Sequence, residues 1–211
     1  LLGQNVNAYA GRLRDGSAGD LGLLIEAVAA VPGIDRIRFT TSHPAAFHAG
    51  LVEAYREVPE LADFLHLPVQ AGSDLLLRLM KRGHDTAAYE ALVAELRAAR
   101  PSLALATDLI VGFPGETEEH FTETMALIDR VGFDAGAFSF IYSPRPGTPA
   151  AALHDPTPQA AKRERLHRLQ ARIAEQQAAA AQRLLGTVQS VLVEGVSRRS
   201  AAELRGRTSC N

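Results

Sequence analysis

Cysteine is almost absent from this chain of 211 residues, which contains only Cys210. A single cysteine cannot form an internal disulfide, and it excludes a metal site built from several cysteines within these residues. No run of about 18 apolar residues occurs, so we expect no membrane-spanning helix. The first residues also lack the basic segment that opens a signal peptide. With a hydrophobic fraction of 46%, the sequence predicts a soluble cytoplasmic protein with no membrane partner.

An initiator methionine is missing too, because the sequence begins at Leu1. We therefore interpret the chain as a piece of a longer protein. Its length is sufficient for one sizeable hydrophobic core and a small additional unit.

Three common signatures of catalysis or nucleotide binding are not found. The chain has no phosphate-binding P-loop and no GxGxxG dinucleotide motif. Serine, histidine and aspartate do not occur at a spacing typical of a known hydrolase triad. The chemistry must therefore be sought in the loops of the predicted fold.

Charge is distributed unevenly along the chain. Residues 1–157 contain 12 basic and 20 acidic residues, whereas residues 158–211 contain 10 basic and 4 acidic residues. The change near residues 156–158 suggests a change of role, and a basic C-terminal part is typical of nucleic-acid binding. The alternative is an arginine-rich, solvated helix face.

Hydrophobic periodicity predicts alternating strands and helices. We expect helices at about 21–31, 45–57, 74–80, 86–100, 117–131 and 158–185, with Thr86 and Thr117 as caps. We expect strands at about 35–40, 64–69, 103–111, 133–142 and 187–194. This order predicts an α/β protein with a parallel sheet, open or closed, and right-handed crossovers. The last strand and the residues near 204 suggest the opening hairpin of a small β-barrel.

The loops that follow the expected strands share neutral hydrogen-bonding side chains and few charges. The set is Gln4, Asn5, Asn7, Thr41, Ser42, His43, Gln70, Ser73, Asp108, Glu116, Ser143 and Arg145. In parallel α/β proteins such loops carry the chemistry, because the carboxyl ends of the strands meet at one edge. A polar ring of this kind suits a bulky polar ligand and supplies no reagent of its own, so it implies a cofactor.

Two residues of this set have two interpretations each, and a nearby histidine has one. His43 is either a base or ligand, or a residue that holds its loop before Pro44. Arg145 is either a clamp on carbonyl groups or a contact for an anion. His66, which lies inside a predicted strand, is interpreted as a core histidine whose hydrogen bonds are satisfied.

Five segments together resemble the methylthiotransferases of the radical SAM superfamily. They are 2–9 (LGQNVNAY), 36–44 (RIRFTTSHP), 66–74 (HLPVQAGSD), 110–117 (IVGFPGET) and 143–150 (SPRPGTPA). The motifs are long and occur in order over essentially the whole chain.

This resemblance implies a domain organisation. Residues 1–157 would form the C-terminal portion of a radical SAM partial (β/α) barrel, incomplete at its N-terminus. Residues 158–186 would be a helical connection packed on the barrel, and residues 187–211 the start of a TRAM RNA-binding β-barrel. The family carries two [4Fe–4S] clusters, one of them on a CxxxCxxC loop. Their cysteines would lie upstream, and Cys210 would not be a ligand.

The resemblance also implies site residues, none of them catalytic or metal-binding in this chain. The pocket for S-adenosylmethionine (SAM) would contain Ser42, Gln70, Ser73, Asp108, Ile110, Gly112 and Tyr142. Substrate would contact Gln4, Asn5, Asn7, His43, Arg145, Arg198 and Arg199. The strand around Ile110 is similar to the superfamily's adenine-contacting strand, usually GxIxGxxE. Asp108 replaces its first glycine and Glu116 comes one place late, so the resemblance assigns Glu116 no role.

The implied activity is methylthiolation of C2 of N6-dimethylallyladenosine at position 37 of tRNA. A radical derived from SAM would remove the C2 hydrogen, and the second cluster would deliver a methylated sulfur. The partners would be the tRNA anticodon loop and an external electron donor, and we expect a monomer. One alternative is methylthiolation of a ribosomal protein. Another is a non-catalytic nucleic-acid-binding module, since this chain alone is expected to be inactive.

Overall fold

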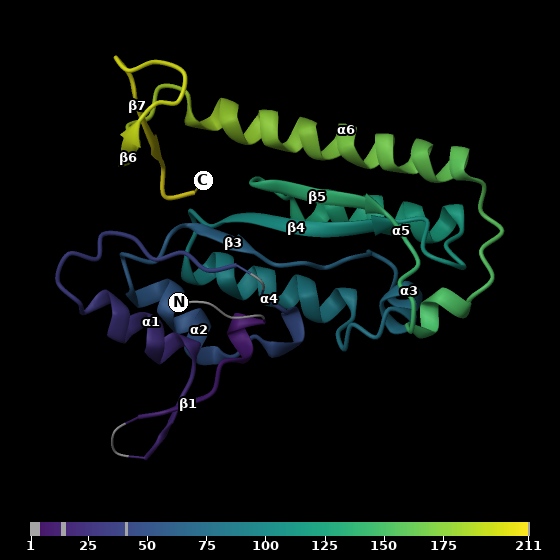
Figure 1. The fold of residues 1–211 in the computed structure, drawn as a ribbon, viewed down its shortest axis with the longest axis horizontal. Helices are drawn as coiled ribbons and strands as arrows, with labels where there is room; N and C mark the ends of the chain where they lie inside the picture. Colours follow the sequence, from purple (N-terminus) through teal and green to yellow (C-terminus); the bar gives the residue numbers. More distant parts are fainter. Residues whose placement is uncertain (1–4, 14–15, 41, 211) are drawn as a thin grey trace.

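A computed structural model describes residues 5–13, 16–40 and 42–210 and shows an α/β fold (Figure 1). The α-helices are α1 Leu21–Ala29, α2 Ala49–Glu57, α3 Asp74–Leu79, α4 Thr86–Ala99, α5 Glu118–Val131 and α6 Gln159–Leu184. Short 3-10 helices span Val6–Ala8, Pro44–Ala46 and Pro149–Ala152. The strands are β1 Gly11–Arg12, β2 Ala18–Gly19, β3 Phe64–His66, β4 Ala104–Val111, β5 Gly136–Ile141, β6 Leu192–Val196 and β7 Leu204–Arg207.

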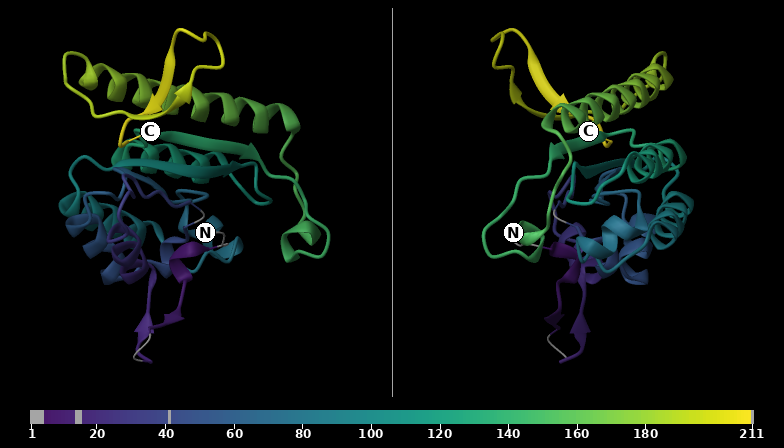
Figure 2. Two further views of the ribbon diagram at one scale, coloured as in Figure 1. Left: turned by 60° about the vertical axis from the view of Figure 1, so that its left-hand side comes forward. Right: turned by 90° about the vertical axis from the view of Figure 1, so that its right-hand side faces the viewer.

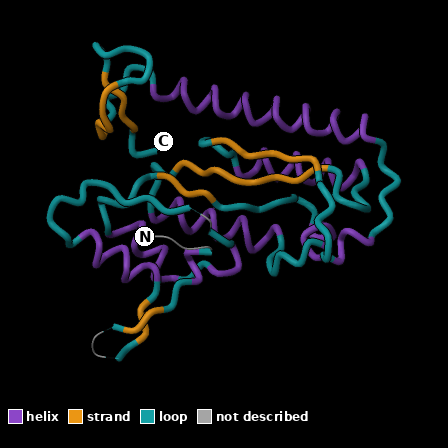
Figure 3. The backbone as a smooth tube through the Cα atoms, viewed as in Figure 1, coloured by secondary structure: helices purple, strands orange, loops and turns teal. Residues whose placement is uncertain are grey.

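The centre of the fold is a parallel sheet in the order β3-β4-β5. Single bridges extend it, between Ile37 and Leu61 and between Gln70 and Leu109. Most β4 residues are buried, as their apolar sequence predicts for a central parallel strand. The predicted α/β class with a parallel sheet is confirmed, whereas the described residues form an open sheet of three strands. Figure 3 shows this sheet apart from the hairpins β1-β2 and β6-β7.

Helices bury one face of the sheet. The helix α6 runs along β5, and α5 lies beside both (Figures 1 and 2). The largest buried side chains include Tyr55, Tyr89, Phe121 and Phe133, and they join one hydrophobic cluster. This cluster gives the carboxyl ends of β3, β4 and β5 a rigid support.

Two helix starts test the predicted caps. The Thr117 hydroxyl accepts a hydrogen bond from the His120 amide, and the His120 ring accepts one from the Thr117 amide. The predicted cap at Thr117 is therefore confirmed, in the form of a capping box. Thr86 is not a cap, because Asp85 holds that position and its carboxylate accepts from the Ala88 amide at 2.8 Å.

Two predicted strands differ in the structure. Residues 35–40 form only the bridge at Ile37, because most of this segment has no neighbour with which to build a ladder. The strand predicted at 187–194 instead begins at Leu192 and continues to Val196, since β7 pairs only with that part. A register shift between Val193 and Gly195 marks an irregularity in this pairing.

The chain ends beside the amino edge of the sheet. Arg36 donates to the carbonyl groups of Arg207 and Thr208, and the Ser209 hydroxyl donates to Asp63, the residue before β3. The β6-β7 hairpin therefore lies at the end opposite to the carboxyl ends of the strands (Figure 2). Within the described residues, no helix is long and apolar enough to cross a membrane.

Candidate cofactor site at the carboxyl edge of the sheet

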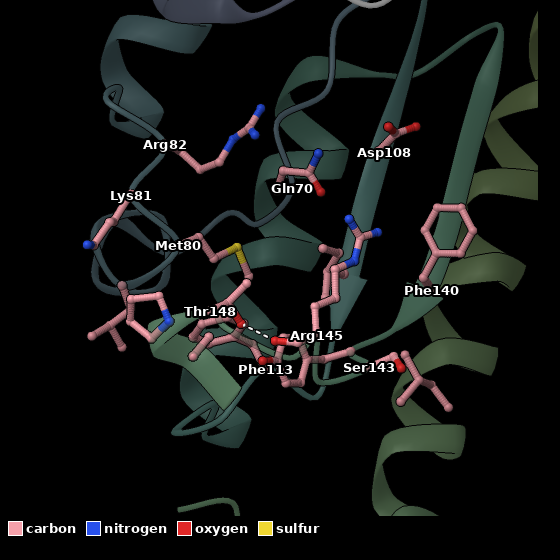
Figure 4. Close-up of a pocket in the computed structure, with 16 residues that line it drawn as sticks. Gln70, Met80, Lys81, Arg82, Asp108, Phe113, Phe140, Ser143, Arg145 and Thr148 are labelled. Atoms are coloured by element: carbon pink, nitrogen blue, oxygen red, sulfur yellow. Dashed lines mark hydrogen bonds between the residues drawn. The ribbon is translucent and has the colours of Figure 1, made fainter. Parts of the chain in front are cut away.

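A cavity of about 630 Å³ opens at the carboxyl ends of β4 and β5 (Figure 4). Its walls come from the strands, from the turn after α3 and from the loop that follows β5. The lining residues are Gln70, Leu79, Met80, Lys81, Arg82, Asp108, Ile110, Phe113, Phe140, Ile141, Tyr142, Ser143, Arg145, Thr148, Pro149 and Ala150. The volume and the combination of apolar side chains with convergent polar groups are typical of a small-molecule site.

The strand register places one row of side chains toward this cavity. Asp108 pairs with Phe138, and Ile110 pairs with Phe140. Because side chains alternate along a strand, these four residues share one face of the sheet. The opposite face carries Thr107, which is buried and donates to the Leu67 carbonyl at 3.0 Å.

Gln70 is held in an uncommon backbone conformation. Its φ angle is 78°, in the left-handed region that residues other than glycine rarely adopt. Its amide donates to the Asp108 carbonyl and its carbonyl accepts from the Ile110 amide, both at 2.9 Å. These two hydrogen bonds hold Gln70 in its strained conformation. Backbone strain of this kind is concentrated at functional sites.

Arg82 is a partly buried cation that has no carboxylate partner among the described residues. Burial lowers the pKa of its guanidinium group, and Asp108 opposes that effect. Its Nε is buried without a hydrogen-bond partner among the described residues, and Nη2 reaches only the Pro68 carbonyl at 3.4 Å. The ion pairs found in the described part of the chain include none with Lys81, Arg82 or Arg145. The cavity is therefore able to accept an anionic group.

Asp108 is oriented by a histidine on the neighbouring strand. His66 Nε2 lies 2.8 Å from Asp108 Oδ1, and the Phe138 ring stands edge-on to the His66 ring at 5.9 Å. His66 thus has the predicted hydrogen-bond partner, but it lies partly exposed on the cavity side and not in the core. The carboxylate keeps a second oxygen for a ligand that can donate hydrogen bonds.

Three further predicted residues lie on the cavity wall with Gln70 and Asp108. Ile110, Tyr142 and Arg145 all line it. The Tyr142 hydroxyl is buried without a partner among the described residues, while its ring packs edge-on against Phe113 at 5.0 Å. Figure 4 shows the Arg145 side chain extending into the space between the strands and the α3 turn.

Ser42 and Ser73 do not line the cavity. Ser42 is buried, and its hydroxyl has no partner among the described residues. Ser73 is buried at the start of α3 and borders a separate polar depression with Thr86, His120 and Arg130.

Hydrogen bonds between Asn7 and His43 join two segments of the N-terminal part of the chain. The Asn7 amide donates to the His43 carbonyl at 2.8 Å and accepts from the His43 backbone amide at 2.9 Å. The His43 ring nitrogen Nδ1 accepts from the Ala45 amide at 3.2 Å, the local bond expected of a loop-fixing histidine. Burial, Arg82 and His84 lower the pKa of this ring. Asn5 is exposed, and Gln4 lies outside the described residues.

Gly112 and Glu116 belong to one turn, which is in contact with side chains of α6. Glu116 Oε2 accepts from the Gly112 amide at 2.7 Å and from Arg165 Nη1 at 2.8 Å. Gly112 has a φ of 67°, and the Lys162 stem packs against it so closely that no Cβ would fit. Glu116 is thus a buried structural acceptor, a role that the motif comparison left unassigned.

The prediction of a solvated basic face on the long helix is partly wrong. Lys162 and Arg165 are buried, and they pair with Asp155 and Glu116 respectively. Arg168 pairs with Glu118 on the surface. Tertiary packing therefore removes two cations from the solvated face. Arg198 and Arg199 are both exposed and lie in the turn between β6 and β7, the hairpin at the end of the sheet opposite to the carboxyl ends of the strands.

Arg82 and Phe140 line the cavity, but neither was predicted from the sequence as a site residue. The basic turn Lys81–His84 was visible, but its position beside the sheet depends on how α3 packs. Lys81 has a φ of 56°, so this turn is strained as well. The run of basic residues from Lys81 to His84, directly after a short predicted helix, is the sequence signal that could have identified it.

Metal ligands are not brought together in the described part of the chain. It contains no group of three or more histidine, cysteine, aspartate or glutamate side chains placed to hold a metal ion. Cys210 lies near Thr208, at the end of the sheet away from the cavity.

Comparison with known proteins identifies relatives over the full length of the chain. It is 75% identical to a tRNA-2-methylthio-N(6)-dimethylallyladenosine synthase of Halorhodospira halophila, with 100% of this chain and 44% of that protein aligned. It is 61% identical to the protein of that name from Methylococcus capsulatus, covering 46% of it. The chain therefore spans somewhat less than half the length of these relatives.

A solved structure and a family model also match parts of this chain. Among solved structures, coproporphyrinogen III oxidase from Escherichia coli aligns with a TM-score of 0.47 and 22% identity, over 67% of this chain and 31% of that one. The family model of the radical SAM superfamily matches residues 13–128, a segment that includes β3, β4 and the cavity residues Gln70, Arg82 and Asp108. Since this match covers more than half of the chain, the chain belongs to the radical SAM superfamily.

Proposed function

We propose that the cavity binds S-adenosylmethionine in a tRNA methylthiotransferase. The observation that carries this proposal is the placement of Arg82, a partly buried cation with no carboxylate partner among the described residues, inside a segment of radical SAM type. The amino-acid carboxylate of SAM is a group that such a cation binds with a charge-assisted hydrogen bond.

The other lining residues suit the remaining parts of that molecule. The second carboxylate oxygen of Asp108 and the side-chain amide of Gln70 are able to hydrogen-bond hydroxyl and amino groups of an adenosyl moiety. Ile110 and Phe113 provide apolar surface for a base. Bound there, SAM supplies the radical chemistry of the superfamily, and this chain's residues orient it and exclude water.

The proposed reaction follows the names of the relatives, and the position in the tRNA follows the resemblance to the methylthiotransferases. It is addition of a methylthio group to N6-dimethylallyladenosine in tRNA, at C2 of the base at position 37. The external electron donor, the monomeric state and the cytoplasmic location remain parts of this proposal. The proposed chemistry removes a hydrogen atom and needs no general base, so the charged side chains of the cavity, Arg82, Asp108 and Arg145, are assigned to binding.

The cluster ligands do not fit among these residues. An iron–sulfur cluster is generally held by four protein ligands, mostly cysteine thiolates, and Cys210 is the chain's one cysteine. We therefore propose that the two [4Fe–4S] clusters are held by parts of the protein outside these 211 residues. No step of the reaction is assigned to Cys210.

The RNA partner is assigned to the C-terminal residues. Residues 187–211 are proposed as the start of a TRAM domain, because β6 and β7 form an antiparallel hairpin with basic residues. Arg198 and Arg199 are proposed as phosphate contacts. Reversing both charges should weaken tRNA binding and reduce the slope of log K against log salt by about 0.7–0.9 for each lost contact. An unchanged slope would assign these arginines to a solvated turn.

The decisive experiment measures SAM binding and product in the full-length protein. Arg82→Met should weaken SAM binding about tenfold or more, as expected for loss of a hydrogen bond to a charged group. Arg78→Met is the matched control, because Arg78 lies on α3 and borders the other depression. Equal SAM affinity in both variants would disprove the cofactor assignment.

Substrate choice is tested separately. The reconstituted full-length protein is incubated with SAM and a reductant, and with either prenylated tRNA or ribosomal protein. Mass spectrometry of the digests should find the added methylthio group in tRNA. Product only on ribosomal protein would support the alternative substrate, and no product on either would favour a nucleic-acid-binding module.

A further inference from the structure

The cavity-facing side of β5 exposes two aromatic rings. Phe138 and Phe140 are 63% and 54% exposed, although residues of this size are usually buried in a central sheet. They stand two residues apart, so both point to the same side of the strand. The intervening Ser139 faces α6 instead, where its hydroxyl accepts from the Gln170 side chain.

This aromatic face is continuous with the cofactor cavity. Phe140 itself lines the cavity and pairs in register with Ile110, while Phe138 pairs with Asp108 and contacts the His66 ring. The strand is the edge of the sheet among the described residues, so the rings are approachable from the open side. Figure 4 shows the Phe140 ring at the cavity margin, on the side away from Arg82.

The chemistry of the face differs from that of the cavity beside it. The polar and cationic groups, Gln70, Asp108, Arg82 and Arg145, gather on one side, and the two rings continue from it as an apolar strip. A second reactant that must lie against the cofactor would therefore present a flat, apolar surface here. Aromatic side chains stack on splayed RNA bases in this manner.

We propose that Phe138 and Phe140 form the stacking surface for the target adenine and its apolar N6 substituent, and so position C2 toward the cofactor cavity. This inference rests on the proposed function and adds the residues that recognise the base. Phe140, at the cavity margin, carries the base, and Phe138 extends the surface for the substituent. Both are positioning residues.

A fluorescence experiment tests the stacking without any turnover. The probe is an anticodon stem-loop RNA with 2-aminopurine at the target position, whose fluorescence falls when the base stacks. Titration with the full-length protein should quench it, and Phe140→Ala should abolish the quenching and weaken binding about tenfold, the loss typical of one stacked base. Phe140→Tyr should retain both, because it keeps the ring.

A competition experiment tests the role of Phe138. Unlabelled stem-loops with prenylated adenine or with plain adenine compete for the wild-type protein, and the prenylated RNA should bind more tightly. Phe138→Ala should reduce that preference and leave the affinity for plain adenine nearly unchanged. Leu23→Ala, an exposed apolar residue on α1, is the control and should change neither.

The outcomes separate the two proposals. If the wild-type protein quenches the probe but makes no methylthio product, the stacking surface stands and the proposed reaction fails. If product forms while Phe140→Ala quenches and binds like the wild type, the stacking proposal is overturned. If both alanine variants lower thermal stability and leave quenching and the prenyl preference intact, the rings are covered by another part of the protein, which also overturns it.

Discussion

Arg165 and Arg82 are both withdrawn from solvent, but they differ in what surrounds their charge. Arg165 lies against Glu116 at 2.8 Å, with side-chain exposures of 8% and 1% for the two residues, and it also reaches Glu118. Arg82 has no carboxylate within ion-pair distance among the described residues, and its Nε has no hydrogen-bond partner there. Arg165 is paired inside the fold, whereas Arg82 lies beside a cavity with no ion-pair partner in the part of the chain that the structure describes.

This difference in charge pairing distinguishes a structural turn from a turn placed to bind a ligand. Buried charges are normally paired, because an unpaired one loses the solvation that water provides. The turn from Gly112 to Glu116 follows this rule and is locked by α6. The turn from Lys81 to His84 departs from it, as expected where a ligand is to complete the charge balance. Three variants test this contrast and a fourth tests another partly buried ion pair, and they follow in order of expected effect.

Arg165→Met should have the largest effect on stability. It leaves the Glu116 carboxylate buried without its cation, and breaking a buried pair in this way costs about 3–5 kcal/mol. Urea unfolding of the full-length protein measures the loss. Arg168→Met is the matched control, since its pair with Glu118 is largely exposed and should cost less than about 1 kcal/mol. Equal losses in both variants would break the comparison.

Gly112→Ala should destabilise by about 1–3 kcal/mol. The residue has a φ of 67°, and a Cβ would lie 2.6 Å from Lys162 Cδ. Gly115→Ala serves as a control for backbone strain alone, because its φ is 88° but nothing lies within 4 Å of an added Cβ. If the two variants unfold at the same urea concentration, the contact with α6 contributes nothing.

Asp63→Asn should change how stability depends on pH. Burial raises the pKa of the Asp63 carboxyl, but hydrogen bonds from Arg100 and Ser209 outweigh it, so the pKa lies below its usual value. A lowered pKa in the folded state stabilises above about pH 4 and loses that contribution as the pH falls through the folded pKa. The variant's stability should therefore fall less steeply below pH 4. A slope equal to that of the wild type would show that this pair contributes nothing.

Arg82→Met should have the smallest effect on stability, within about 0.5 kcal/mol of the wild type or slightly stabilising. The substitution removes a partly desolvated charge that has no ion-pair partner among the described residues, while SAM affinity falls. Thermal unfolding without ligand provides the measurement. A loss as large as that of Arg165→Met would mean that Arg82 holds the fold, and the contrast between the two turns would be wrong.

The local features of the fold could be predicted from the sequence. The helix α5 begins at the predicted cap, and β4 lies where an apolar run preceded a Gly/Pro turn. These features depend on spacing and capping, which short segments contain. Asp85 was missed as a cap because Asp85 and Thr86 are both good N-cap residues, and the sequence does not decide between neighbours.

Part of the site was also predictable. Gln70, Asp108, Ile110, Tyr142 and Arg145 follow or end strands, and all five line the cavity. Ser42, Ser73 and Gly112 follow strands too but lie elsewhere, because following a strand does not determine which way a side chain points.

By itself, the sequence determined the α-helices, the strands of the central sheet, their order and the polar character of the strand ends, since periodicity, caps and residue chemistry are local properties. Only the tertiary structure decided which cations are paired. Lys162 and Arg165 read as a solvated helix face until α6 packs on the turn at Gly112, where Arg165 pairs with Glu116, 49 residues earlier in the chain. Likewise, the sequence predicts a strand around Phe138 and Phe140, but only the position of β5 at the edge of the described sheet decides that both rings are exposed. Burial and charge pairing depend on segments far apart in the chain, and a local pattern contains no information about them.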